Sequence, residues 1–395
     1  MREMGFMEKL LDGAHVEWKS LASICKIETG KLNANAATED GAYMFFTTAK
    51  EVSKIDKYRW DTEALLIAGN ANVGDVKHYS GKFEAYQRTY VLTNFSEKLN
   101  VRYLFHIVSN SLKQYLEDRT NSAAMTYIVL STLENFPIPI PCPDNPKKSL
   151  EIQAEIVRIL DAMTAHTAEL TAELTARKKQ YDYYRDKLLS FEEDVYEFPL
   201  TDICTSIADG DHQAPPQTST GINFVTISNI SKNGFIDFSK TKYVPDDYYK
   251  NLASKRKPRF GDVLYTVVGS IGIPVFIDFE KEFTFQRHVA ILRFKTELVN
   301  PKYVFHFMRS RIFFNKANSV AMGAAQKTIT LGTLGKLKIS LPSLERQNNI
   351  VAILDKFDSL ANSITDGLPR EIELRQKQYA YYRDLLLSFP AAQAA

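Results

Sequence analysis

The sequence predicts an α+β protein in which two β-rich globular domains are joined by two long helices. The helices are expected to pack as an antiparallel coiled coil about a pseudo-twofold axis. The first observation is a repeat: residues 177–191, RKKQYDYYRDKLLSF, return at 375–389 as RQKQYAYYRDLLLSF, with 12 of 15 positions identical at an offset of 198. The second is that each copy ends a long stretch with helical apolar spacing. The third is that each stretch follows about 140 residues of strand and turn signals, so one unit is written twice.

The first long helix is predicted from residues 151–191, which contain neither proline nor glycine. Its apolar positions recur at spacings of three and four and are Ile156, Leu160, Met163, Leu170, Leu174, Tyr181, Tyr184, Leu188 and Phe191. Such a seam is typical of a helix that packs on another helix, and the helix would be about 60 Å long. The tandem Thr-Ala-Glu-Leu at 167–174 is good helix-forming sequence and also a possible length adjuster, since each unit adds about 6 Å.

The second long helix is predicted to be interrupted. The block Ile156 to Asp161 returns as Ile350 to Asp355 at an offset of 194, four less than the offset of the later block. The second copy therefore contains an insertion of about one helical turn. Because Gly367 and Pro369 lie there, we expect one helix to end and another to begin with Pro369 in its first turn.

The chain is predicted to divide into residues 1–145, 146–192, 193–342 and 343–395. The first and third segments are globular, with short β-rich runs separated by Gly, Asn, Asp and Ser turns. Each is expected to close with a helix, at 101–116 or 301–317, and a strand that ends at Pro141 or Pro342. Because they share little sequence outside a few matched positions, the two domains should have one fold and different surfaces.

Bulk composition excludes several classes of protein. A net charge of +2 gives no overall attraction to nucleic acid or anionic lipid, so binding of either must come from local patches. The three scattered cysteines contain no CxxC pair, which argues against a disulfide framework or zinc site and favours the cytoplasm. The N-terminal region has no uninterrupted apolar segment, and the run at 263–279 is too short and broken to span a membrane.

No catalytic constellation emerges from the sequence. Residues 332–336, Gly-Thr-Leu-Gly-Lys, have the wrong spacing for a phosphate-binding P-loop. Residues 300–303, Asn-Pro-Lys-Tyr, lack the second proline of the motif typical of amino-methyltransferases. The seven histidines are dispersed, and His106 and His306 fall at matched helix positions. We therefore interpret these two histidines as packed framework, and we expect no metal site.

Candidate DNA contacts lie in loops with amide, cationic or aromatic side chains. Amides suit adenine and cations suit guanine or phosphate. In the first domain the candidates are Lys31, Asn70, Asn72, Lys77, His78, Tyr79, Gln87 and Arg88; in the second they are Lys255, Arg256, Lys257, Arg259, Ser270, Gln286, Arg287, Gln326 and Lys327. For each loop a solvated turn is an equally good interpretation. Because Gln-Arg recurs at 87–88 and 286–287, these pairs either belong to the framework of the shared fold or read DNA bases.

The chain as a whole resembles the specificity subunits of type I restriction–modification enzymes. The resemblance rests on the Gln-Tyr-x-Tyr-Tyr-Arg-Asp blocks at 180–186 and 378–384, on the twin Ile-Leu-Asp blocks, and on the break at 366–370. Residues 65–70 and 86–90 also look typical of the family. It implies two target recognition domains, each reading half of a split sequence in double-stranded DNA, with helices that set the unread gap.

The resemblance also implies partners. Two methyltransferase subunits would carry S-adenosylmethionine, and two restriction subunits would use ATP and Mg²⁺, whereas this chain would bind no cofactor and catalyse nothing alone. By helical phase Tyr183 and Tyr381 lie off the seam, so we expect docking through them and through Arg185 and Arg383. The alternatives are an assembly scaffold that reads no bases and a self-contained methyltransferase or nuclease, which the absent motifs disfavour.

Overall fold

The computed structural model describes residues 13, 15–119, 127–191, 195–210, 215–324, 326–362 and 367–390. The chain divides into two compact units. The first comprises Met1–Ala168 and Leu374–Ala395, and the second comprises Glu169–Glu373.

The first unit is built around a six-stranded sheet with a long helix on one face. The strand order is β2 (Lys26–Thr29), β7 (Thr89–Thr93), β5 (Trp60–Ala68), β6 (Val76–Ala85), β3 (Tyr43–Phe46) and β4 (Ser53–Ile55). Only the β3 and β6 pairing is parallel among these neighbours. The remaining elements are β1 (Val16–Ser20), η1 (Leu21–Ser23), η2 (Ala34–Ala36), α2 (Val101–Glu117), α3 (Leu130–Glu134) and β8 (Pro137–Pro141), which pairs with β1.

The second unit has the same strand order with one strand divided. One sheet is β10 (Cys204–Asp209), β16 (Val289–Phe294), β13 (Val263–Thr266) and β14 (Pro274–Phe276), and the other is β15 (Phe283–Phe285), β11 (Ile222–Val225) and β12 (Lys242–Val244). β14 and β15 together replace β6, since β14 pairs with β13 as β6 pairs with β5, and β15 runs parallel to β11 as β6 does to β3. Exposed charged residues, among them Asp278 and Glu280, lie between β14 and β15. These side chains favour solvent, so this segment does not continue the strand pairing of the sheet.

Short elements complete the second unit. They are β9 (Glu197–Pro199), α5 (Leu200–Ile203), η3 (Ile227–Asn229), η4 (Phe238–Lys240), α6 (Asp246–Asn251), η5 (Ser254–Arg256), α7 (Pro301–Arg309), α8 (Arg311–Val320), α9 (Leu331–Lys336) and β17 (Lys338–Ser340). The prediction of one helix over 301–317 is wrong. The helix stops at Ser310, whose backbone is extended and whose hydroxyl accepts a hydrogen bond from the Phe313 amide to begin α8.

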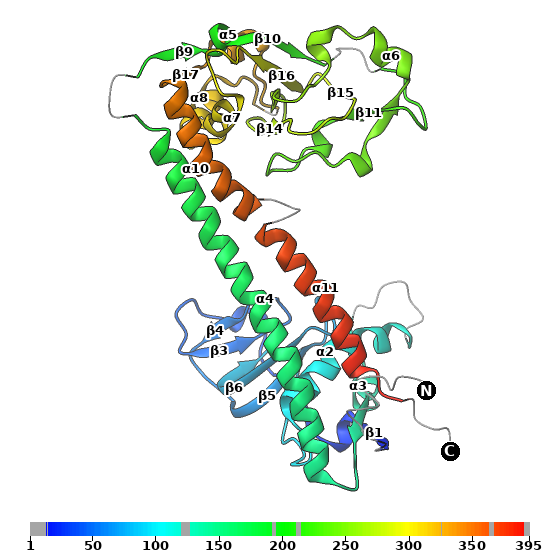
Figure 1. The fold of residues 1–395 in the computed structure, drawn as a ribbon. Helices are drawn as coiled ribbons and strands as arrows, with labels where there is room; N and C mark the ends of the chain where they lie inside the picture. Colours follow the sequence, from blue (N-terminus) through cyan, green and yellow to red (C-terminus); the bar gives the residue numbers. More distant parts are fainter. Residues whose placement is uncertain are drawn as a thin grey trace. The chain divides into compact units, whose positions relative to one another are not determined.

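The long helices follow the predicted pattern. α4 (Pro146–Leu188) is continuous over 43 residues, and α10 (Leu344–Asn362) and α11 (Leu368–Leu387) are separate helices (Figure 1). The predicted restart with Pro369 in the first turn is confirmed, whereas Asp366 lies outside the described residues. No described helix has an apolar stretch long enough to cross a membrane.

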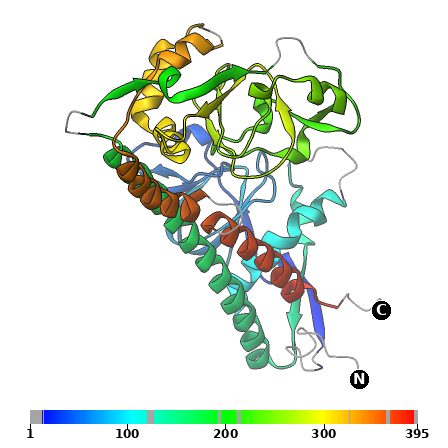
Figure 2. The ribbon, with the colours of Figure 1, turned by 45° about the horizontal axis from the view of Figure 1, so that its top comes forward.

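Each unit contains its own antiparallel helix pair. In the first unit Ile152, Ile156 and Leu160 of α4 share a core with Leu386 and Leu387 at the end of α11. The chain then reaches β1, whose neighbourhood with the end of α11 can be followed in Figure 2. There the Trp18 indole N–H donates to the Pro390 carbonyl (3.0 Å).

In the second unit Tyr184 of α4 stacks on Phe357 of α10, with ring centroids 5.4 Å apart. The predicted packing of the long helices is confirmed within each unit, and the predicted internal repeat is confirmed by the strand order that the two units share.

Candidate nucleic-acid interface

One edge of the first sheet gathers four segments that are distant in sequence. Gly69 donates its N–H to the Arg88 carbonyl (2.9 Å), and Ile128 donates to the Gly69 carbonyl (2.8 Å). Gln87 donates its backbone N–H to the Leu32 carbonyl (2.9 Å). A small hollow of about 100 Å³ lies among these segments.

Four of the predicted contact residues lie at this edge. Lys31, Gln87 and Arg88 are exposed. Asn70 pairs with Tyr127 in an isolated bridge, and its side-chain oxygen is buried with no hydrogen-bond partner among the described residues. This edge therefore presents amide and cationic groups together, as a base-reading surface requires.

The prediction that Lys77, His78 and Tyr79 lie in a loop is wrong, because β6 begins at Val76. Lys77 donates to the Ala49 carbonyl (3.0 Å) and pairs with Asp75, and His78 bonds Glu63 at 2.8 Å. The Tyr79 ring packs on Phe46 and Phe83. Asn72, which does lie in the loop, donates to the Thr48 carbonyl (2.7 Å). These four side chains are engaged within the domain, so they are weaker candidates for DNA contact than those at the sheet edge.

The corresponding edge of the second unit gathers the equivalent segments. Val267 donates to the His288 carbonyl (2.9 Å), and Gly269 donates to the Lys327 carbonyl (2.8 Å). The sequence candidates brought together here are Ser270, Gln286, Arg287, Gln326 and Lys327. Gln286 is half-buried and the other four are exposed. The Lys327 ammonium donates to Asn318 (2.6 Å).

The recurring Gln-Arg pairs are not equivalent in the structure. Ala85 pairs with Phe46 as Phe285 pairs with Val225. At matched positions Gly30 and Gly210 pack so tightly on the carbonyls of Ala85 and Phe285 that a Cβ would overlap the oxygen.

This register makes residues 286–288, Gln-Arg-His, the counterparts of residues 86–88, Tyr-Gln-Arg. When the two units are matched by their strand pairing, the Gln-Arg pair at 286–287 therefore lies one residue earlier than the pair at 87–88. The two turns thus present different side chains on the same backbone frame, which weakens the framework interpretation.

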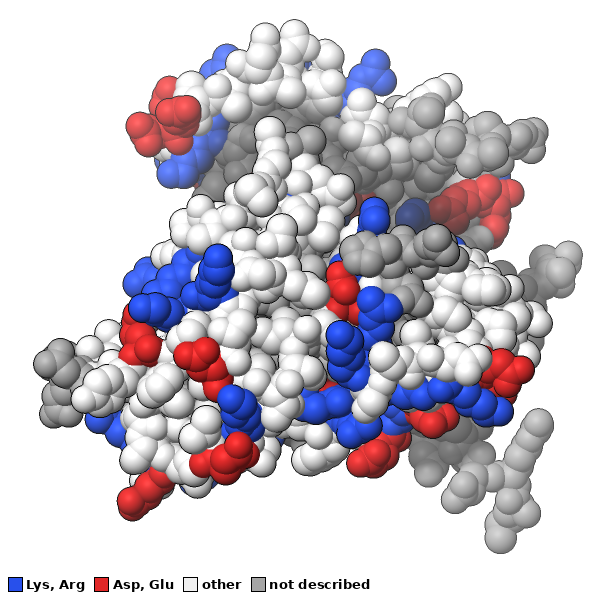
Figure 3. All heavy atoms as spheres, turned by 90° about the horizontal axis from the view of Figure 1, so that it is seen from above, with Lys and Arg blue, Asp and Glu red and all other residues white. Residues whose placement is uncertain are grey.

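The basic cluster at 255–259 lies along β10 and is not one of the segments gathered at the sheet edge. Lys257 donates to the Lys250 carbonyl (2.9 Å), and Arg259 donates to the Ser254 hydroxyl (2.6 Å). Arg256 lies 3.8 Å from Asp209, and Lys255 is exposed. On the face seen in Figure 3, basic side chains occur in groups bordered by acidic ones. Local basic groups of this kind can contact phosphates.

The two tyrosine blocks present matched exposed rings. Tyr183 is 60% exposed and Tyr381 is 66% exposed. Each packs edge-on against the next tyrosine, with centroids 5.3 Å apart in the first copy and 5.4 Å in the second.

The two arginines of these blocks differ in exposure. Arg185 is buried, paired with Asp182 (2.7 Å) and Asp186, so it is not placed to contact a partner. Arg383 is partly exposed and pairs with Asp384 (2.7 Å).

A joint that the sequence did not suggest connects each globular domain to its long helix. In the first unit the Asn100 N–H donates to the Gln153 side-chain oxygen (2.8 Å), and in the second the Asn300 N–H donates to Gln347 (2.9 Å). Both glutamine side chains are fully buried. Their Nε2 groups donate back to the carbonyls of Lys98 and Leu298.

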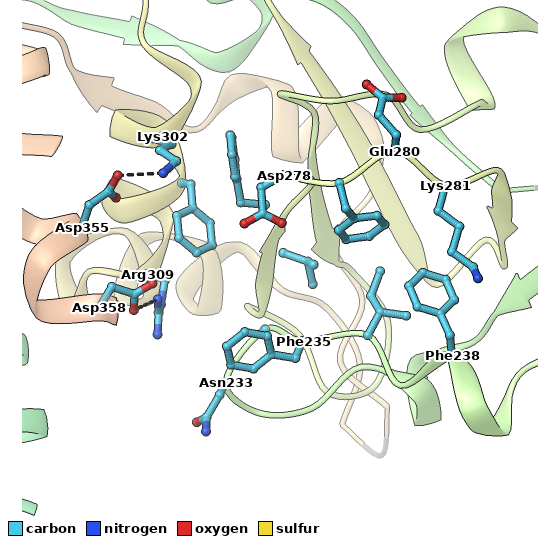
Figure 4. A pocket seen from close by; sticks show the side chains of 16 residues that line it. Asn233, Phe235, Phe238, Asp278, Glu280, Lys281, Lys302, Arg309, Asp355 and Asp358 are labelled. Carbon is cyan, nitrogen blue, oxygen red and sulfur yellow. Dashed lines mark hydrogen bonds and ion pairs between the residues drawn. The ribbon is translucent and has the colours of Figure 1, made fainter. Parts of the chain in front are cut away.

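A histidine and an aspartate complete the joint. His106 lies 2.9 Å from Asp161 and His306 lies 2.8 Å from Asp355, through Nε2 in both cases. Because a carboxylate only accepts hydrogen bonds, each Nε2 carries the proton. Arg102 also donates to Asp161, and Lys302 donates to Asp355 (2.7 Å; Figure 4). The prediction that both histidines are packed framework is confirmed.

Burial and ion pairing set the charges in the joint. Burial lowers the pKa of His106 and of His306 more than their aspartate partners raise it. Burial raises the pKa of Asp161 and Asp355, but the hydrogen bonds from the neighbouring basic and histidine groups outweigh it and hold both pKa values below the usual range. The joint is thus a neutral imidazole donating to a carboxylate.

A hollow of about 490 Å³ opens beside the second joint. Phenylalanine rings and charged side chains line it, and the ion pairs Lys302–Asp355 and Arg309–Asp358 lie on one side (Figure 4). Among the described residues, no group of acidic, histidine and cysteine side chains could hold a metal ion.

Comparison with known proteins gives one consistent family. The family model for the type I restriction modification DNA specificity domain matches residues 15–177 and again residues 192–374. The EcoR124I/EcoR124II specificity subunit of Escherichia coli is 35% identical over 431 residues, covering 99% of this chain and 98% of that protein. A putative type I restriction enzyme specificity subunit of Haemophilus influenzae is 33% identical and covers 97% and 98%.

Solved structures agree on the fold. The crystal structure of the S subunit of a type I restriction–modification system from M. genitalium has a TM-score of 0.62 at 14% identity, covering 97% of this chain and 98% of that one. A chain from a study of complex assembly and conformational transition in the type I system has a TM-score of 0.58 at 14% identity, covering 94% and 97%.

Proposed function

Because this chain belongs to the specificity subunits of type I restriction–modification systems, we propose that its two globular domains read the two halves of a split site in double-stranded DNA. The first domain reads one half-site and the second reads the other. The long helices set the number of unread base pairs between them. The chain itself catalyses nothing.

The observation that carries this proposal is the pair of matched sheet edges. Both units have one strand order, and in both the residue after β5 or β13 bonds to the turn before β7 or β16 and to the segment before α3 or α9. The side chains differ, since residues 86–88 are Tyr-Gln-Arg and their counterparts 286–288 are Gln-Arg-His. Base-edge recognition depends on these donor and acceptor patterns. Because the two domains share one backbone arrangement but present different side chains, we predict that the two half-sites differ in sequence.

The matched tyrosine blocks support docking of identical partners. Tyr183 and Tyr381 are exposed aromatic residues at equivalent positions, and aromatic side chains are enriched in protein interfaces. We assign one methyltransferase subunit to each block and two restriction subunits to the full complex. S-adenosylmethionine, ATP and Mg²⁺ bind to those partners, and the complex works on DNA in the cytoplasm.

Methylation-sensitive sequencing of genomic DNA with and without this gene tests the proposal. We expect one split motif to lose methylation when the gene is deleted, which would give both half-sites and the gap. A chain carrying Gln286→Ala and Arg287→Ala should change only one half-site, while Lys31→Ala and Arg88→Ala should change only the other. Loss of no motif on deletion, in cells that express the partner subunits, would contradict DNA reading.

A further inference from the structure

The joint between each globular domain and its helix contains two kinds of contact. One is apolar: in the first unit Ile152, Ile156 and Leu160 of α4 pack in the core that contains Tyr103 and Leu104 of α2. The other is the set of directional hydrogen bonds from Gln153 and Asp161. These two kinds of contact differ in how well they specify position.

The apolar contact is nearly the same after a shift of one helical turn. Ile152, Ile156 and Leu160 follow one another at intervals of four, so each would take the place of the next. The hydrogen bonds have no such repeat. A one-turn shift in one direction would put Val157 where Gln153 lies and Ala165 where Asp161 lies. A shift in the other direction would put Ser149 and Val157 at these two places. The first shift would leave both the Asn100 N–H and the His106 ring without an acceptor, and the second would leave the His106 ring without one.

The second unit has the same arrangement. Ile350 and Leu354 of α10 pack in the core. A one-turn shift would put either Val351 and Ser359, or Ser343 and Val351, where Gln347 and Asp355 lie, so each direction replaces one of the two acceptors by valine. The two domains differ widely in sequence, yet the distances of the bond to the glutamine Oε1 and of the bond from the histidine Nε2 agree within about 0.1 Å between the two joints. Both joints therefore specify a single register by polar contacts.

We propose that Gln153 with Asp161, and Gln347 with Asp355, are positioning residues that restrict the protein to one gap length between its half-sites. This inference rests on the proposed function. One helical turn is about 5.4 Å and one base step about 3.4 Å, so a domain that shifts or tilts by part of a turn moves by the scale of one base pair. The apolar seam holds each domain on its helix, and the polar contacts select the register.

The test uses the full chain assembled with its methyltransferase partners and duplexes in which the half-sites stay constant while the gap varies. The main variant is Gln153→Met with Asp161→Leu, which keeps side-chain size and removes the acceptors. Gln347→Met with Asp355→Leu is its match in the second unit. Glu155→Gln, at a partly exposed position on the same helix, is the control.

We expect the wild type and the control to prefer one gap length. In each double variant the preference for that gap over gaps one base pair longer or shorter should fall by about tenfold, which corresponds to about 1.4 kcal/mol. Discrimination against a base change within either half-site should stay at its wild-type value. If a double variant does not fold, Gln153→Met alone is judged by the same two ratios.

Two results would overturn the inference without touching the proposed function. One is a folded variant that binds more weakly at every gap but keeps the wild-type gap preference, since the joint would then be only structural. The other is an equal loss of gap and half-site discrimination. By contrast, a wild type that discriminates neither gap nor half-site would contradict the proposed function itself.

Discussion

Removing the Asp355 carboxylate should destabilise the second unit by the cost of one buried, unpaired imidazole. In Asp355→Ala the fully buried His306 loses the acceptor of its Nε2 proton, while Nδ1 keeps the hydrogen bond from the Tyr181 hydroxyl (3.2 Å). A buried donor left without an acceptor costs about 1–3 kcal/mol. The ion pair with Lys302 adds little, because the side chains are 41% and 35% exposed.

The expected change is measurable by thermal and urea unfolding of the full chain. For a unit of about 200 residues, a loss of about 2 kcal/mol lowers the midpoint of its transition by roughly 4–8 °C. Asp247→Ala, at a position where the side chain is 90% exposed, is the matched control and should change almost nothing.

A second replacement isolates the cause. In Asp355→Ala with His306→Leu the orphaned donor is gone, so part of the lost stability should return. A shift in Asp355→Ala no larger than that in Asp247→Ala would contradict an orphaned imidazole as the cause, and so would a double variant whose loss is simply the sum of the two single losses.

Three further predictions concern pH, partner binding and the gap. Because His106 and His306 have lowered pKa values in the folded chain, the unfolded chain takes up protons more readily; stability should fall as pH drops below about 6.5, and a titration of unfolding midpoints checks this. A midpoint that is flat from pH 7.5 to 5 would contradict it. Tyr183→Ala and Tyr381→Ala should each weaken binding of one methyltransferase subunit, so native mass spectrometry should show one bound subunit in place of two; unchanged stoichiometry and affinity would exclude docking there. Deleting 171–174 removes about 6 Å of continuous helix, so the gap should change by one or two base pairs while both half-sites stay the same, and unaltered spacing in the methylation pattern would refute this.

The helical part of the fold follows from local sequence. The continuous α4 was predictable because a seam at spacings of three and four with no proline or glycine is a property of one segment. The break before Leu368 was predictable for the same reason, since Gly367 and Pro369 act on their own backbone.

The sheet was predicted less well, because strand limits depend on neighbours distant in sequence. Val76 begins β6 since β5 pairs with it over eight positions, although residues 69–79 look like a loop when considered alone. The division of the equivalent strand into β14 and β15 likewise depends on two different partner strands, β13 and β11. The candidate reading residues were affected in the same way, because Lys77 and His78 are bonded to residues that only the folded sheet brings near them.

The sequence by itself determined that the chain is a duplicated unit, where its long helices run and break, and which family it resembles. These conclusions rest on the periodicity of apolar residues and on repeated residues, both of which can be recognised in a single sequence. Only the tertiary structure decided which residues of the two units are equivalent. It set the two turns in register so that Gln286 corresponds to Tyr86, and it brought Gln153 and Asp161 to Asn100 and His106 across about 50 residues. A hydrogen bond selects its partner in space, and the spacing of residues along the chain does not record that choice.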